Sequence, residues 1–255
     1  MPAQVDLSKL SVRQFAERFR SEMIPLSNTF SYFCASVPMS EEDLKEYLEE
    51  PVAALPPGVA AALPKISILL VPYLERTNGK DSSRTKLSPA EYVSIEKPLH
   101  GRISAATQLS LGTETVLAFA LKEQEVAEYH YRLYHLLATV LGGQWTEAME
   151  TQYSRLVREE LNADVHGEVD EASWRLKQAL RRSQTTLNPK AFRKYALQSF
   201  IDTLTLYLHG ICCDIDVDTG PRQLPSRYLR KRLVVLQELF PPPQGYAVFP
   251  EQLGS

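Results

Sequence analysis

Residues 114–141 read ETVLAFALKEQEVAEYHYRLYHLLATVL, and the fold prediction depends on them more than on any other segment. Leucine and valine recur there at helical spacing, and Gly142 and Gly143 follow directly, as glycines do beyond a helix end. The pattern predicts the longest helix of the chain. We therefore expect a mainly α protein with a C-terminal helical bundle.

The segments after residue 141 carry helix start signals. Thr146 and Asp170 are suited to helix N-caps, and Pro189 and Pro225 stand where proline is favoured at a helix start. The expected helices are 146–162, 170–182, 189–209 and 226–240. Together with 114–141 they form a predicted bundle over residues 113–240, followed by a Pro-rich docking tail over 241–255.

The N-terminal residues 1–112 are expected to be a mixed α/β region, although all three parts could also form one domain. The run KISILLVPYLE, residues 65–75, is rich in β-branched and apolar residues and predicts a strand. Further short strands are expected at 92–96 and 103–111, so a small β element covers about 65–111. Residues 76–88 are polar and read as a loop, either a lid or a plain connection.

The sequence also predicts secondary structure for other N-terminal segments. Residues 11–23 have a helical apolar stripe, and Ser40 with Asp43 three residues later predicts a capped helix start. The aromatic run 30–37 fits a buried strand or a packed connector equally well.

Composition excludes several classes of protein. The chain has 255 residues and a formal net charge of −3, which argues against a protein that coats nucleic acid or an anionic membrane. Three cysteines are too few for a disulfide framework, and no window is apolar enough for a membrane span. We expect a soluble protein of the cytoplasm.

The segment around His209 holds residue types that a thiol nucleophile requires. Cys212 and Cys213 follow the histidine closely, and Asp214 comes next. The spacing fits no cysteine protease order, and buried, inert cysteines are the ordinary alternative. An enzyme without a local motif, such as a thiol- or metal-dependent hydrolase at these residues, remains one alternative function.

Metal ligands are not expected at any position. The run from Asp214 to Gly220 places its glycine and its twelfth residue wrongly for a calcium loop. His130 and His135 lie five residues apart and diverge around a helix, and neither has a glutamate three residues before it. Glu128 and Arg132 have the spacing of an ordinary i,i+4 ion pair.

A basic cluster near the C-terminus gives a second alternative, a nucleic-acid-binding accessory protein. The candidate contacts are Arg227, Arg230, Lys231 and Arg232. The competing interpretation is a solvated helix face, because the local charge excess is small.

The favoured function is an interaction module: a soluble intracellular adaptor, regulator or complex subunit that binds another macromolecule, first of all a protein. It rests on the lack of chemical motifs, on an acidic N-terminal and a basic C-terminal half, and on the tail. The candidate partner-binding residues of the tail are Tyr246, Val248 and Phe249. Enzyme activity is kept only as the alternative given above, and no cofactor or membrane contact is expected.

Overall fold

The computed structural model describes residues 10–76, 91–99, 102–122, 124–182, 189–213 and 222–249. The chain divides into two compact units, Met1–Glu49 with Leu63–Arg132, and Glu50–Ala62 with Leu133–Ser255. Helix makes up 54% and strand 19% of the described residues, so the fold is mixed α/β and the expectation of a mainly α protein holds only in part.

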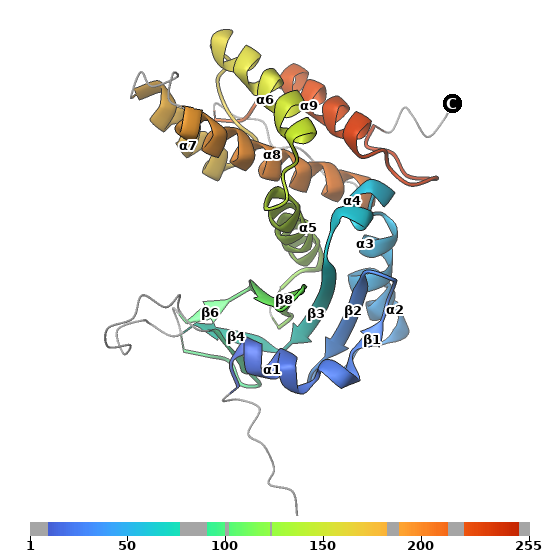
Figure 1. Cartoon of the computed structure of the whole chain (residues 1–255). Helices are drawn as coiled ribbons and strands as arrows, with labels where there is room; N and C mark the ends of the chain where they lie inside the picture. Colours follow the sequence, from blue (N-terminus) through green and yellow to red (C-terminus); the bar gives the residue numbers. More distant parts are fainter. Residues whose placement is uncertain are drawn as a thin grey trace, which may run out of the picture. The chain divides into compact units, whose positions relative to one another are not determined.

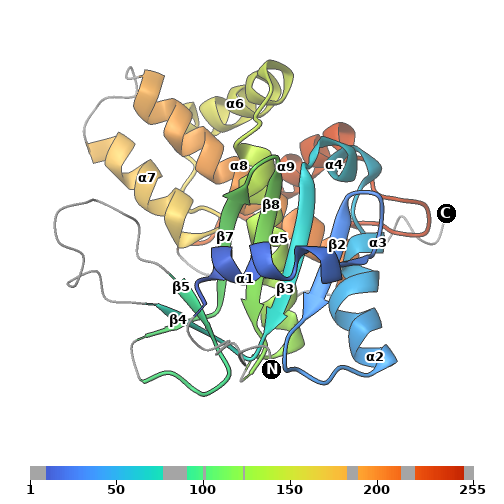
Figure 2. The same ribbon diagram turned by 60° about the horizontal axis from the view of Figure 1, so that its bottom comes forward.

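The first unit is built on a five-stranded sheet of order β1-β2-β3-β8-β7. Its strands are β1 (Ile24–Pro25), β2 (Phe30–Cys34), β3 (Lys65–Val71), β7 (Ala106–Leu111) and β8 (Glu114–Ala120). The three central strands β2, β3 and β8 run parallel, and the edge strands β1 and β7 are antiparallel to their neighbours. Figures 1 and 2 both show β3 beside β8.

The centre of this sheet is buried on both faces. Leu69 of β3 and Val116 of β8 belong to one core cluster with Phe15. Alternate residues face the other way, where the Phe119 ring lies 4.9 Å from that of Tyr129. A parallel strand covered on both sides therefore has a continuous apolar run with no polar alternation.

Burial on both faces explains the main correction to the sequence analysis. Residues 114–120 form the strand β8, so the predicted helix over 114–141 is wrong in its first part. The helix α5 spans Val126–Gly142. The aromatic run 30–37, left open between strand and connector, contains β2.

A second, antiparallel sheet of order β5-β4-β6 completes the strands of the first unit. These strands are β4 (Tyr73–Arg76), β5 (Glu91–Ser94) and β6 (Ile103–Ser104). The expected β element at 65–111 is therefore divided between two sheets. Residues 77–88 of the predicted loop lie outside the described residues.

The N-terminal half of the chain also forms short helices. They are α1 (Val12–Arg18), a 3-10 turn at Arg20–Glu22, α2 (Glu41–Leu44) and a π-helical turn at Lys45–Glu49 in the first unit, and α3 (Glu50–Ala53) and α4 (Pro57–Ala62) in the second. The Ser40 hydroxyl accepts a hydrogen bond from the Asp43 N–H at 3.1 Å, so the predicted N-cap is confirmed.

The second unit is helical. It contains the end of α5 and the helices α6 (Glu147–Asn162), α7 (Glu171–Arg182), α8 (Pro189–Cys212) and α9 (Ser226–Leu239). These bounds confirm the four predicted helices, although α8 continues three residues beyond the predicted end. With 24 residues α8 is longer than α5, and it contacts α6, α7 and α9. A helix enclosed in this way is buried around most of its circumference.

Candidate functional site

Four charged side chains form a cluster in the interior of the second unit. Arg232 of α9 and Lys177 of α7 are fully buried, and so are Glu160 of α6 and Glu168 of the α6–α7 connection, with exposures of 2% or less. Two cations face two carboxylates, so the cluster is balanced in charge. Buried ions require such pairing because their desolvation costs several kcal/mol each.

Arg232 is the centre of this buried cluster. Its guanidinium donates to both carboxylate oxygens of Glu160, at 2.5–3.2 Å, and to both of Glu168, at 2.7 and 3.0 Å. A further hydrogen bond goes to the Ser199 hydroxyl at 2.7 Å. Lys177 Nζ lies 3.0 Å from Glu168 and donates to the Gly167 carbonyl at 2.7 Å. One side chain thus joins α6, α8 and α9.

The backbone around Glu168 is held close to another segment. Its N–H donates to the Arg222 carbonyl, and its own carbonyl accepts from Leu224, each at 3.0 Å. Gly167 has φ +73°, and a Cβ there would lie 2.0 Å from the Gln223 carbonyl oxygen. Glycine is therefore required at this position, because a side chain would push the two segments apart.

The pKa values of the buried groups are shifted by these ion pairs and by burial. Burial by itself would raise the pKa of Glu168, but Arg232 and Lys177 outweigh it and lower that pKa to about 2. Burial also lowers the pKa of Lys177, with Glu168 opposing the shift. Tyr195 donates a short hydrogen bond to Glu168, and burial together with this carboxylate raises the pKa of the phenol. Glu168 therefore stays ionised at neutral pH.

Arg232 was predicted to lie on a basic surface, and this prediction is wrong because the side chain is fully buried. The buried positions of Glu160 and Lys177 were not predicted. A signal was present, since all three charged residues stand at core positions of their helices. Arg232 lies in the buried stripe Leu229, Arg232, Leu233 and Leu236.

The other basic candidates lie on the exposed side of α9. Arg227, Arg230 and Lys231 are exposed, and Val234 on the same side is 39% exposed. The Arg227 guanidinium stacks on the Tyr228 ring at 4.7 Å, and Lys231 Nζ lies 5.6 Å from the same ring. We call Arg227, Arg230, Lys231 and Val234 the α9 surface.

The tail returns to the second unit. Phe249 is buried, and the Arg230 guanidinium lies 4.3 Å from its ring. The Tyr246 N–H donates to the Pro243 carbonyl at 3.1 Å, and Tyr246 and Val248 are half-buried. Of these partner-binding candidates, Phe249 therefore packs against its own chain.

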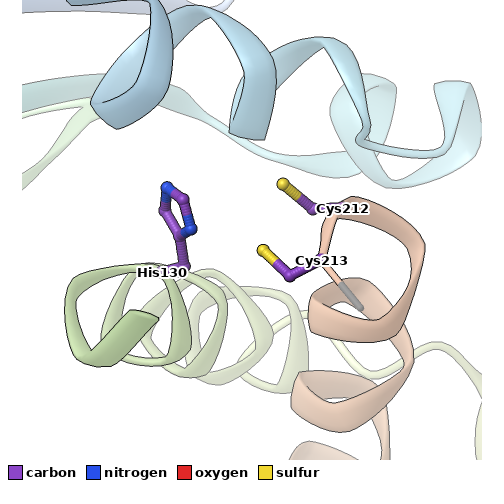
Figure 3. Close-up of side chains that lie close together, drawn as sticks. All are labelled: His130, Cys212 and Cys213. Carbon is purple, nitrogen blue, oxygen red and sulfur yellow. The ribbon is translucent and has the colours of Figure 1, made fainter. Parts of the chain in front are cut away.

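The two adjacent cysteines stand where α8 ends. Cys212 is the last helical residue, and the Cys213 N–H donates to the His209 carbonyl at 2.8 Å. Among the described residues neither cysteine forms a disulfide, both are half-buried, and their sulfur atoms lie within 4.8 Å of each other. Figure 3 shows both sulfurs on one side of the helix end and also draws His130 of α5.

The surroundings of the two thiols shift their pKa values in opposite directions. A hydrogen bond from Cys213 lowers the pKa of Cys212 to about 7 against the effect of burial, and Tyr134 adds to the lowering. The pKa of Cys213 is raised by this shared hydrogen bond and by burial. His209 is buried, and its ring lies 6.0 Å from that of Tyr134. Asp214 lies outside the described residues.

The histidines of α5 have ordinary contacts. His130 Nε2 lies 2.9 Å from the Glu46 carbonyl oxygen, and His135 Nδ1 lies 3.4 Å from the Thr205 hydroxyl. The predicted ion pair between Glu128 and Arg132 is confirmed, at 3.2 Å.

Comparison with known proteins adds no relative. The chain matches no protein-family model, no curated protein and no solved structure. Across the described residues, no helix combines the length and the apolar character needed to cross a membrane.

Proposed function

We propose that the protein is an interaction module, and that its α9 surface binds a partner protein through acidic side chains placed around an apolar one. The observation that carries this proposal is the exposed stripe itself. Arg227, Arg230, Lys231 and Val234 follow the spacing i, i+3, i+4 and i+7, which places them on one side of α9.

The positions of the cations support a ligand of opposite charge. Arg227 lies in the first turn of α9, where the helix dipole disfavours positive charge. Arg227 and Lys231 also repel each other across an i,i+4 spacing. Among the described residues, neither has a carboxylate partner. Their placement lowers the stability of the helix and is explained by a bound acidic group.

The surface is also partly ordered before binding. Tyr228 lies against two of the cations, and Phe249 lies under Arg230. Stacking restricts these long side chains, so less rotamer entropy is lost when a partner binds.

The size of the surface favours a protein over a nucleic acid. The three cations lie within five residues, which is about 6 Å along the helix axis. Nucleic-acid-binding proteins commonly make about 6–10 phosphate contacts. A short cationic stripe that ends on the exposed Val234 is better matched by a peptide or helix with acidic residues beside an apolar anchor.

The experiment places a photo-cross-linking residue, p-benzoylphenylalanine, at position 234 of the full chain in cells that naturally contain the protein. We expect a discrete protein adduct whose cross-linked peptide is acidic. The triple variant Arg227→Glu, Arg230→Glu and Lys231→Glu should reduce this adduct about 5- to 150-fold, because three exposed ion pairs contribute about 1–3 kcal/mol.

A matched control separates the α9 surface from net charge. Three exposed cations on other helices are reversed together, in the variant Arg155→Glu, Arg182→Glu and Lys194→Glu. This variant should keep the adduct. A nuclease-sensitive adduct, an equal loss in both triple variants, or no adduct at all would contradict the proposal.

A further inference from the structure

The end of α8 brings two thiols together in a way that consecutive helical residues do not. Side chains of neighbouring residues diverge by about 100° around a helix. The helix ends at Cys212, and Cys213 lies in the bend that follows. Both sulfurs nevertheless point to one side, within 4.8 Å of each other (Figure 3).

We infer that Cys212 and Cys213 form a two-thiolate site for a thiophilic metal ion, Zn²⁺ or Cu⁺. Thiolate sulfur is a ligand that both ions prefer over harder divalent cations. In a tetrahedral zinc site with Zn–S bonds of about 2.3 Å, two sulfurs are about 3.8 Å apart. Small side-chain rotations are enough to reach that separation from the observed pair.

Access and charge agree with this assignment. Both cysteines are half-buried, so an ion can reach the sulfurs while part of the surrounding water is excluded. Glu50, in the same unit, is near enough for its negative charge to act on both sulfurs, and this field favours a cation. Tyr134 is buried and contacts Cys212, which limits the movement of that side chain.

The binding step balances without an oxidant. Each thiol that ligates the ion releases its proton to solvent, and a metal–sulfur bond replaces the sulfur–hydrogen bond. Water occupies the coordination positions that protein atoms leave open, as in zinc sites that retain an exchangeable ligand.

This site is independent of the α9 surface. No metal ligand was predicted here because the residue spacings fit no known metal motif, and a metal-dependent hydrolase at these residues was only an alternative function. Adjacent cysteines on a helix diverge in direction, but the side-chain conformations of this pair bring the two sulfurs within 4.8 Å of each other.

The test titrates the reduced, chelator-treated full chain with Zn²⁺ against a chromophoric competitor, and in a parallel experiment with Cu⁺. We expect one ion per chain. Cys212→Ser and Cys213→Ser should each weaken binding at least about 100-fold, since even loss of a supporting residue costs about 10–100-fold. Cys34→Ser is the matched control, because this third cysteine is also half-buried and belongs to the other unit.

Co²⁺ gives a second measurement that does not depend on affinity. Sulfur-to-cobalt charge-transfer absorption should appear with the native chain and with Cys34→Ser, and should weaken in either of the other serine variants. Circular dichroism checks that each variant folds, and the alanine variant at the same position replaces any serine variant that does not. Failure of both Zn²⁺ and Cu⁺ to bind, or equal binding in all variants, would overturn the inference.

Discussion

Replacing Arg232 by methionine should strongly destabilise the second unit. Methionine fills much of the same volume, so the change removes the charge without opening a large cavity. Glu160 and Glu168 then share only Lys177 as a buried cation, and the cluster changes from neutral to singly negative. Breaking a buried ion pair in this way costs about 3–5 kcal/mol.

The acidity of Glu168 gives a second estimate of the same size. Its pKa falls from an ordinary 4.5 to about 2 in the folded chain, which corresponds to roughly 3 kcal/mol of stability at neutral pH. Because the folded pKa is the lower one, this contribution is complete above about pH 4.5. It is lost as the pH falls toward 2.

Urea unfolding followed by tryptophan fluorescence measures the effect. The chain has two tryptophans, Trp145 and Trp174, and both belong to the second unit. We expect Arg232→Met to lower the free energy of unfolding by about 3–5 kcal/mol at pH 7 and by less at pH 3. Arg230→Met, on the exposed side of the same helix, should stay within about 0.5 kcal/mol of wild type. If Arg232→Met changes stability by less than about 1 kcal/mol, the reasoning is refuted.

Three further predictions concern other positions. Gly167→Ala should lower stability by at least about 2 kcal/mol in the same assay, whereas Gly245→Ala, with open space around its Cβ, should cost about 1 kcal/mol. Iodoacetamide should label Cys212 at a rate that rises through about pH 7. Cys34 should react far more slowly, because burial raises its pKa to about 11. Mass spectrometry of the labelled peptides measures both rates. Ser40→Ala should cost about 1 kcal/mol in thermal unfolding followed by far-ultraviolet circular dichroism, and an unchanged midpoint would contradict the capping argument.

Local chemistry made the helices of the second unit predictable. N-cap side chains and proline act within one turn, so the starts at Thr146, Pro189 and Pro225 could be read from neighbouring residues. The strand β8 could not be recognised in this way. Its seven residues are apolar on both sides because other elements cover both faces of the sheet, and a short apolar run has no periodicity that separates strand from helix.

The residues of the candidate sites also differ in whether the neighbouring sequence alone could reveal their role. The exposed residues Arg227 and Lys231 were found because a basic run is visible in the sequence. The buried role of Arg232 required the helical register, which puts it among leucines although the two residues before it, Arg230 and Lys231, are exposed cations. The convergence of Cys212 and Cys213 depends on their side-chain conformations, which the sequence does not show, and the predicted end of α8 lay three residues too early.

The division of the chain also has a consequence for its synthesis on the ribosome. Residues 50–62 belong to the second unit, but they emerge within the sequence of the first. Their buried residues Ala54, Leu55 and Val59 have no complete partner until residues 133–255 have been made. At about 5–20 residues per second, that takes roughly 6–25 s. During this interval the nascent chain exposes an apolar segment to chaperones and proteases, and a product truncated at residue 132 would expose it permanently.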